Sequence, residues 1–566
     1  MQKNLEKAIL NGYSSQTAMS HVSVLASLGE KAPGNEAELK ACKYLTDVLQ
    51  SYGLSVEVQE FDCFAGYRGE GDLALLSPQQ TLIRCVVQSF SGSTPPEGIE
   101  AEVVYVRDVA QGIGKADVSG KIVLLDGAGL GQVERASLAE SAGSIGQIFA
   151  TSIEEDAILC VQNRKVWGNP TPESYASIPK SPVVNITKRD AEHIKQLLET
   201  SQVKMKLTAT AFVGWKKARQ PIATLYGGDR KKYVMISSHY CSWWDGAIDN
   251  CAAAAVTLEL ARVLAKHKKE LKRSVKFAFW TGHTHATYAG STYYVDNKWE
   301  DISANMIAEF NIDSPGEKQS SCPPYITNGQ AEFRALHLQS IREVTGLKPG
   351  DEGLTIERAS KIGDSSFWGI GVPRVAFDML KEPFDMWFWH TAEDTTDKVD
   401  MSKASWIFKT YALSALRIVN SEVIPADFVS VADEYAEVLE RLREKIVIDL
   451  DSLTLKTKRF KKEVSKLNRA SAKAKGAKAQ KINDCLMKLS RVTMPPLYQR
   501  TGRYNHDEMA RVNVLLPQLR STQDLTTVDK NSDESRLAVT KLVRERNKVG
   551  EALDSAIELV TRTLNS

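Results

Sequence analysis

The spacing of apolar and polar positions divides the chain into four blocks. In the first block, apolar side chains recur at helical spacing from Ala37 to Leu49, Gly53 ends this run, and Leu54 to Phe61 alternates as a strand does. In the second block, from Phe64 to Lys204, Gly, Ser and Pro residues separate short apolar segments in which strands and helices alternate. Its predicted elements are strands at 101–106, 121–125, 145–150 and 182–186 and helices at 135–144 and 188–198.

The third block, from about Pro221 to Asn420, has a longer alternation. Its predicted elements are buried strands at 233–238, 275–280 and 306–312 and an Ala-rich helix at 250–267. Strand, helix and strand in this order predict βαβ units and a mainly parallel sheet. Ligands of such sheets bind beyond the carboxyl ends of the strands, so the loops that follow these strands are the candidate site.

The fourth block begins near Asp427 and is rich in Lys, Glu, Leu and Ala at helical period. The run from Lys456 to Lys481 continues the helical pattern, and its positive charge is typical of a solvated helix face rather than a nucleic-acid site. Pro495 and Pro496 are predicted to interrupt the helices. We interpret this block as a helical domain suited to packing against a partner subunit.

Composition and charge narrow the class of protein. The 566 residues exceed what one core holds, and at roughly 100–200 residues per domain three or four domains are expected. A formal net charge of +2 gives no argument for binding nucleic acid or a membrane. Neither a signal peptide at 1–19 nor an apolar run long enough to span a bilayer is apparent. The eight cysteines are scattered and are typical of reduced thiols, which predicts a cytoplasmic location.

Residue types that bind metals stand just past the predicted strands of the third block: His239, Asp249, His283, His285, Asp313 and His390. Taken singly, a histidine beside an apolar strand is commonly a hydrogen-bonded structural residue, and Asp249 is equally suited to cap a helix. Their shared sheet edge favours one site. Two divalent ions about 3.5–4 Å apart need a bridging carboxylate and flanking ligands, which His239, Asp249, His285, Asp313 and His390 supply. Mixed nitrogen and oxygen ligation suits zinc, with cobalt, manganese and nickel as alternatives.

Several short motifs occur around these residues in a distinctive order. They are Ser238-His239, Gly246 to Asn250 followed by Leu258 to Arg262, Tyr288 to Ser291, Asn311 to Asp313, and His390 to Asp394. In order and spacing, residues 233–400 resemble the di-zinc exopeptidases that include aminopeptidase Y, glutamate carboxypeptidase and the transferrin receptor. More weakly, the segments 486–491 and 504–506 resemble the helical dimerisation domain of the carboxypeptidase and receptor branch.

The resemblance implies a phosphorylase/hydrolase-like α/β fold with a mainly parallel sheet, a mixed α/β protease-associated insert and a C-terminal helical domain. It implies that His239 and Asp313 hold one ion, that His390 and His285 hold the other, and that Asp249 bridges them. A homodimer is also implied. The expected domains are 1–63, the first part of the peptidase domain, 64–210, the insert, 211–424, the rest of the peptidase domain, and 425–566, the helical domain.

The chain departs from the family's pattern first at two adjacent positions. Five and six residues before its Gly-Ser pair, the family has two glutamates, a metal ligand and a general base; here His285 and Thr284 occupy these positions. Thr284 is no base at neutral pH and is expected only to orient water or substrate. His283 is the predicted proton carrier, with a hydrogen-bonded supporting role as the equal alternative. Other candidates for the base are Asp245, Glu309, Asp364 and Glu393.

A third departure is Cys241, where the family often has an aspartate that orients the first histidine. Aromatic residues crowd the same loops, and Trp243 or Trp244 is a candidate pocket wall for an apolar substrate group. The leading hypothesis is metal-assisted hydrolysis of an amide bond by an aminopeptidase or other exopeptidase acting on a peptide or a small amide. The alternatives are a hydrolase of a non-peptide amide or ester, and a receptor-like binding protein without catalysis.

Overall fold

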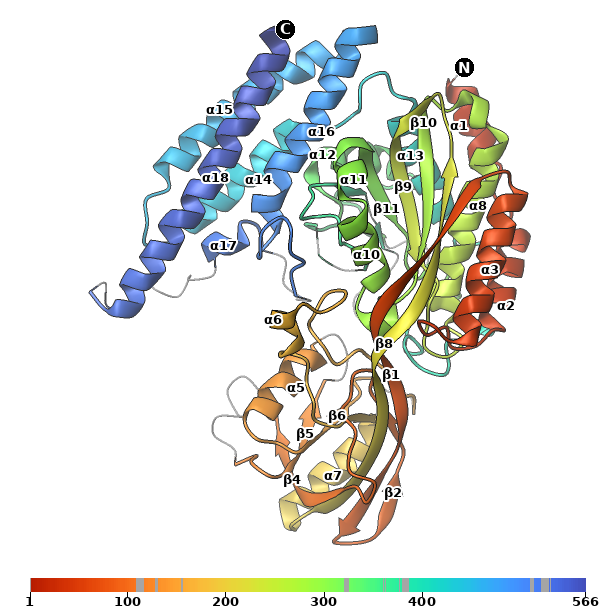
Figure 1. Cartoon of the computed structure of the whole chain (residues 1–566), viewed down its shortest axis with the longest axis vertical. Helices are drawn as coiled ribbons and strands as arrows, with labels where there is room; N and C mark the ends of the chain where they lie inside the picture. Colours follow the sequence, from red (N-terminus) through yellow and green to blue (C-terminus); the bar gives the residue numbers. More distant parts are fainter. Residues whose placement is uncertain are drawn as a thin grey trace.

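The structure is a computed structural model that describes residues 2–107, 117–127, 131–153, 156–319, 325–359, 361, 363–375, 377–378, 386–508, 514–520, 529 and 531–565. Figure 1 shows a central sheet covered by helices, a separate lobe reached through two long strands, and a group of long C-terminal helices beside the sheet. Among the described residues, no helix combines the length and the apolar character that crossing a membrane requires.

Four parallel strands lie in the described part of the central sheet, and the sequence predicts three of them. The four strands are β9 (Asp229–His239), β10 (Arg273–Trp280), β11 (Met306–Asn311) and β14 (Arg374–Val375), and they lie in the order β14-β11-β9-β10. The first three match the predicted strands closely. β10 and β11 both run parallel to β9, so their carboxyl ends meet at one edge of the sheet. The mainly parallel α/β fold is therefore confirmed.

Alternate residues of β9 enter two different cores because successive side chains of a strand point to opposite faces of the sheet. Val234 and Ile236 pack against one layer, which includes α8 (Ala253–Lys266) and α13 (Ser405–Asn420). Tyr233 and Met235 pack against the other, which includes α10 (Ala289–Asn297) and α11 (Trp299–Asn305). Both faces of the sheet are covered, as a parallel sheet requires.

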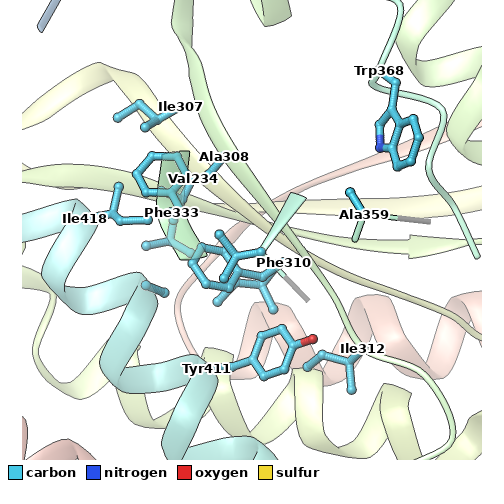
Figure 2. Close-up of a cluster of buried hydrophobic side chains, with 14 of the residues drawn as sticks. Val234, Ile307, Ala308, Phe310, Ile312, Phe333, Ala359, Trp368, Tyr411 and Ile418 are labelled. Carbon is cyan, nitrogen blue, oxygen red and sulfur yellow. The ribbon is translucent and has the colours of Figure 1, made fainter. Parts of the chain in front are cut away.

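The first core fixes the end of β11 (Figure 2). The rings of Phe310 and Tyr411 lie 5.7 Å apart, and the Tyr411 hydroxyl donates to the Asn311 carbonyl at 2.8 Å. Val234, from the neighbouring strand, lies in the same cluster. This packing holds the strand end from which the chain continues to Asp313.

The N-terminal helices cover the same face as α8. They are α1 (Gln2–Leu10), α2 (Ser15–Ala26) and α3 (Glu36–Ser51). Helix α3 begins at Asn35, whose side chain accepts the Glu38 N–H, and its chain turns at Gly53, whose φ of 82° suits glycine. The helix predicted between residues 37 and 49 is confirmed.

Two long antiparallel strands lead to the separate lobe. β1 (Ser55–Ser77) pairs with β8 (Lys204–Leu225) along most of their lengths. We call residues 78–203, the chain between these strands, the insert lobe. Its elements are β2 (Thr81–Ile83), β3 (Cys85–Val87), β4 (Ile99–Val106), β5 (Ile122–Asp126), α5 (Gln132–Ser141), β6 (Gly146–Ala150), α6 (Pro172–Tyr175), β7 (Val183–Ile186) and α7 (Lys188–Thr200).

The predicted strands and helices of this lobe are confirmed, with ends that shift by a few residues. The predicted boundaries at 63/64 and 210/211 fall inside β1 and β8, which run unbroken from the central sheet into the lobe. The assignment of the lobe as a protease-associated domain stays a prediction.

The C-terminal region is helical, as its composition predicts. Its elements are α14 (Phe428–Arg443), α15 (Asp451–Ser471), α16 (Gly476–Tyr498), α17 (Pro517–Arg520) and α18 (Asp533–Asn565). The helix predicted to continue from 456 to 481 instead breaks between α15 and α16, at Gly476 with a φ of 55°. Pro495 and Pro496 lie inside the last turns of α16 and do not interrupt it before Tyr498.

The remaining described elements connect the parts of the central domain. They are η1 (Ala247–Ala252), η2 (Lys268–Glu270), α9 (His283–Ala286), β12 (Tyr325–Thr327), α12 (Ala331–Thr345), β13 (Leu354–Ile356), β15 (Phe377–Asp378) and η3 (Thr396–Lys398).

Candidate active site

The strand register brings His239 and Asp313 together. His239 is the last residue of β9, and Asn311 of β11 pairs with Ser237 of β9. Two residues further along each strand, His239 and Asp313 therefore reach the same level. His239 Nε2 lies 3.6 Å from Asp313 Oδ1, and its Nδ1 lies 2.9 Å from the Cys241 carbonyl oxygen. The backbone contact leaves Nε2 directed at the carboxylates.

Asp249 lies between two histidines. Its Oδ1 is 3.1 Å from His239 Nε2, and its Oδ2 is 2.9 Å from His390 Nε2. Asp249 is 7% exposed, and it lies inside η1 with non-helical φ and ψ of −111° and 84°. One carboxylate that presents each oxygen to a different imidazole has the arrangement of a ligand shared by two metal ions.

The Asp249 loop is held by Asp394. Its Oδ1 accepts the Ile248 N–H at 2.8 Å and its Oδ2 accepts the Asp249 N–H at 3.0 Å, while its carbonyl accepts the Ala247 N–H at 3.1 Å. Asp394 follows His390 by four residues, so one short segment supplies both a candidate ligand and the support of the Asp249 loop. Burial raises the pKa of Asp394 to about 7, and the two backbone N–H groups act against that rise.

These donor atoms suit a divalent metal. Within the described part of the chain, His239 Nε2 and Asp249 Oδ1 are buried and have no hydrogen-bond partner, although they lie 3.1 Å apart. Burial alone would lower the pKa of His239, but Asp249 and Asp313 outweigh it and raise that pKa well above its usual value. Burial would raise the pKa of Asp249, and His239 and His390 hold it well below its usual value instead. Converging lone pairs of imidazole nitrogen and carboxylate oxygen are what zinc binds.

His283 joins this cluster. Its ring stacks on His239 with centroids 3.7 Å apart, and ligand atoms of His239, His283 and Asp313 lie within 4.8 Å of one another. His283 Nδ1 lies 2.9 Å from Asp364 Oδ2. A carboxylate at Nδ1 leaves Nε2 as the nitrogen available to the cluster, because it fixes the proton on Nδ1.

His285 lies apart from the cluster. Its Nδ1 is 2.8 Å from Thr284 Oγ1 and its Nε2 is 3.1 Å from Glu30 Oε1, so both ring nitrogens have protein partners. His283 and His285 belong to the same helical turn, α9, where residues two apart point about 200° away from each other. The predicted ligand role of His285 stays a prediction that this geometry does not favour.

Thr284 and Cys241 lie behind the cluster. The Thr284 hydroxyl contacts His285 Nδ1 and donates to Cys241 Sγ at 3.5 Å, which leaves it turned toward protein groups. Cys241 Sγ also accepts the His283 N–H at 3.2 Å and lies 3.9 Å from His239 Nδ1. The sulfur therefore contacts the His283 backbone and the His239 ring from the position where the family often has an aspartate.

The other candidate bases are Asp245, Glu309 and Glu393, and none of them is hydrogen-bonded to His283 among the described residues. Glu309 is buried on β11 against the Ser237 hydroxyl, at 3.1 Å. Glu393 is exposed, and the Asp245 carbonyl accepts from the buried Lys31 ammonium at 3.0 Å. Of these candidates, only Asp364 is hydrogen-bonded to His283 in the described residues.

The aromatic residues of the loops mostly support the site. The Trp243 ring lies 4.6 Å from His390 and 5.7 Å from His285, and only 3% of Trp243 is exposed. The Arg68 guanidinium covers the Trp244 ring at 4.3 Å. Trp243 thus packs between two histidines and offers little surface to a substrate.

Sequence reasoning missed Glu30 and Trp167, which lie far from the third block along the chain. Glu30 binds His285 and Arg68, and Trp167 donates to Ser366 beside the site. Neither residue stands in a motif, and only the tertiary packing brings them to the site.

Comparison with known proteins agrees with this arrangement. Residues 221–414 match peptidase family M28. The chain is 25% identical over 409 residues to carboxypeptidase Q of Xenopus laevis, covering 69% of this chain and 83% of that protein. It is 22% identical over 585 residues to a probable glutamate carboxypeptidase of Arabidopsis thaliana, covering 86% and 81%.

Solved structures show the same fold. A peptidase M28 precursor of Shewanella amazonensis superposes with a TM-score of 0.62 at 20% identity, covering 75% of this chain and 97% of that one. A zinc aminopeptidase of Bacillus subtilis superposes with a TM-score of 0.57 at 22% identity, covering 72% and 96%. Residues 221–414 therefore match peptidase family M28, and by its similarity to these peptidases the chain is a metallopeptidase-like hydrolase.

Proposed function

We propose that this protein is an exopeptidase that hydrolyses an amide bond at a peptide terminus with two divalent metal ions, most simply zinc. The observation that carries the proposal is Asp249, whose two oxygens lie 3.1 and 2.9 Å from the Nε2 atoms of His239 and His390. His239 and Asp313 would hold one ion, His390 the other, and Asp249 both. When bound, the ions supply Lewis-acid polarisation of the scissile carbonyl and lower the pKa of the attacking water.

The proton transfer is assigned to His283. Asp364 holds its Nδ1 at 2.9 Å, which directs Nε2 to the cluster. Nε2 accepts the proton of the attacking water and returns it to the leaving amine, the role that a buried carboxylate supports in other hydrolases. His283 is 12% exposed at its side chain, so solvent and substrate reach it while its orientation stays fixed.

Metal stoichiometry tests the centre first. The zinc content of the protein is measured by elemental mass spectrometry after equilibration with zinc and removal of excess metal. We expect two ions per chain in the wild type and a clear loss in Asp249→Asn, because the shared carboxylate becomes an amide. A wild type that retains none would overturn the proposal, and one retained ion would restrict the centre to His239, Asp249 and Asp313.

Turnover tests the reaction. The zinc-loaded protein is assayed on aminoacyl p-nitroanilides, on N-blocked dipeptides with a free carboxyl terminus, and on simple esters. We expect hydrolysis of one of the two peptide classes, with a loss of roughly 100- to 10,000-fold in kcat for His283→Ala at unchanged zinc content. The exposed His193→Ala is the matched control. Hydrolysis of esters alone would favour the non-peptide alternative, and no turnover with full zinc content would favour a binding protein.

The proposed function includes cleavage at either the amino terminus or the carboxyl terminus of a peptide. Carboxypeptidases and aminopeptidases both occur among the relatives, and the substrate panel decides between them. The homodimer and the cytoplasmic location stay predictions from the sequence.

A further inference from the structure

The insert lobe reaches the candidate active site with one short segment. The part of the lobe that carries α6 faces α10 of the central domain (Figure 1). A Cβ on Gly168 would lie 2.5 Å from a methyl group of Thr292, a contact too close for any side chain. The Gly168 N–H donates to the Thr287 carbonyl at 2.6 Å. The backbone of the lobe is therefore seated directly against the loop that joins α9 to α10.

Arg164 fixes the same loop. Its Nε donates to the Thr287 hydroxyl at 3.0 Å and its Nη2 donates to the Ala286 carbonyl at 2.7 Å. The side chain is fully buried, and Thr287 has a φ of 45°. An arginine from the lobe thus holds the end of the α9 turn in a backbone conformation that non-glycine residues rarely adopt.

Trp167 lies next to this contact and enters a hydrogen-bond chain that ends at His283. Its Nε1 donates to Ser366 Oγ at 2.9 Å, and the Ser366 and Ser291 hydroxyls lie 2.8 Å apart. Ser291 Oγ donates to Asp364 Oδ1 at 2.8 Å, and Asp364 Oδ2 is 2.9 Å from His283 Nδ1. These residues are buried, except His283, which is 12% exposed at its side chain.

The indole sets the direction of this chain. An indole N–H only donates, so the Ser366 oxygen accepts it and keeps its own hydrogen for Ser291. Ser291 has one hydrogen, and the Asp364 carboxylate at 2.8 Å is a better acceptor than the Tyr288 carbonyl at 3.2 Å. One oxygen of the carboxylate then accepts a hydrogen bond from Ser291, and the other accepts one from His283. Successive donations in one direction strengthen one another.

The ring of Trp167 adds a second contact. It packs on Tyr288 with centroids 4.0 Å apart, and the Tyr288 ring meets His283 edge-on at 4.6 Å. The Lys361 ammonium lies 4.4 Å from the Trp167 ring centroid. The ring of Trp167 therefore reaches His283 through Tyr288 alone, and its N–H reaches His283 through the hydrogen-bond chain.

We infer that Trp167 is a positioning residue for the Asp364–His283 pair, so that the insert lobe is part of the active site. The inference rests on the proposed role of His283 in catalysis. Trp167 acts on His283 through Ser366, Ser291 and Asp364. The lobe thereby determines the orientation of the proton-carrying imidazole.

The test compares Trp167→Phe, Ser366→Ala and their double variant with the wild type. Trp167→Phe keeps an aromatic ring and removes the N–H. We expect kcat to fall roughly 3- to 10-fold in each single variant, the worth of one net hydrogen bond, with KM little changed. Because both variants break the same chain, the double variant should lose no more than the larger single loss.

The control is Trp368→Phe. Trp368 is equally buried, and its Nε1 has no hydrogen-bond partner in the residues that the structure describes. We expect its kcat to equal that of the wild type. Single losses that multiply in the double variant, or an equal loss in Trp368→Phe, would reduce Trp167 to ordinary packing and overturn the inference.

A second readout needs no turnover. Diethyl pyrocarbonate modifies accessible imidazoles, and mass spectrometry gives the rate at His283, with His193 as the internal reference. We expect Trp167→Phe and Ser366→Ala to raise the His283 rate by the same few-fold factor, and Trp368→Phe to leave it unchanged. An unchanged rate overturns the inference. If the wild type hydrolyses no amide, only the proposed function is overturned, because the labelling rate still reports on His283. If Trp167→Phe fails to fold, the result for Ser366→Ala decides the test.

Discussion

At the scale of single residues, the site depends on how each imidazole is held. His239 and His283 stack at 3.7 Å, yet their partners differ: His239 contacts a backbone carbonyl, and His283 contacts the buried Asp364. A carbonyl fixes only the tautomer, whereas a carboxylate also stabilises an imidazolium. This difference is the reason that the proposed function gives the ligand role to His239 and the proton-carrying role to His283.

Asp364→Asn tests that assignment. The amide keeps the size of the side chain but no longer stabilises a positive charge on His283, and it can turn an N–H toward Nδ1. We expect kcat to fall by at least ~100-fold while zinc content stays at the wild-type level. Steady-state kinetics and elemental analysis on the same preparation measure both quantities. A loss of zinc in step with the loss of turnover would instead make Asp364 a support of the metal site.

Glu38 gives a prediction about stability and pH. Burial raises the pKa of its carboxyl to about 7, although the Arg219 N–H and the Thr281 hydroxyl donate to it. Because the folded-state pKa lies above the unfolded value, its contribution to stability is full below pH ~4.5 and is lost as the pH rises through ~7. We expect this loss to be about 3 kcal/mol.

Glu38→Gln is neutral at every pH and removes that dependence. Urea unfolding of both proteins between pH 4.5 and 8 measures this dependence. The unfolding free energy of the variant should increase relative to that of the wild type as the pH rises. A difference between the two unfolding free energies that stays constant over this range would mean that folding does not raise the pKa of Glu38.

At the scale of elements, the site is built from strand ends and from loops that brace one another. β9 and β11 place His239 and Asp313 through their register, and η1 presents Asp249. The loop of His390 is separate from both, and Asp394 connects it to η1 through three hydrogen bonds. The bridging arrangement therefore depends on a contact between two loops.

Asp394→Ala should weaken the metal site without removing a ligand. Without the carboxylate, the Ile248 and Asp249 N–H groups lose their acceptor and the η1 loop loses its fixed position. We expect zinc affinity to fall roughly 10- to 100-fold, the usual effect of losing a group that supports a ligand. Competition with a chromophoric chelator measures it. Asp397→Ala, at a side chain that is 66% exposed, is the control, and equal affinities of the two variants would contradict the role of Asp394.

At the scale of the whole molecule, two regions dock on the central domain through buried arginines that donate to carbonyls. Arg164 of the insert lobe donates to the carbonyls of Gly168 and Ala286. Arg491 of α16 attaches the C-terminal helices to the central domain. It donates to the carbonyls of Gly371, Ile302, Ser303 and Met306. Guanidinium groups suit this task because they carry several donors in a fixed plane.

Arg491→Met should loosen the C-terminal helices. The variant leaves several buried carbonyls without a donor, and we expect unfolding to become easier by roughly 3 kcal/mol or more. Thermal unfolding and limited proteolysis around α16 measure the effect. Lys488→Met, on an exposed position of the same helix, is the control, and a similar change in both variants would show that Arg491 is no anchor.

The sequence by itself determined three parallel strands and the Ala-rich helix of the central domain and four strands and two helices of the lobe, because hydrophobic period is a local property. It also determined the residue types at the strand ends, and with them the metal chemistry. Its errors fall where local signals are weak. The break at Gly476 lies in a run of lysine and alanine, and Pro495 is tolerated in a last helical turn.

Only the tertiary structure decided which histidine faces the cluster. His283 and His285 share one helical turn and point apart, and Gly282, with a φ of 69°, sets where that turn starts. Their partners, Asp364 and Glu30, come from distant parts of the chain, as does Trp167. Side-chain direction after a strand depends on such packing, and no local pattern of apolar and polar residues encodes it.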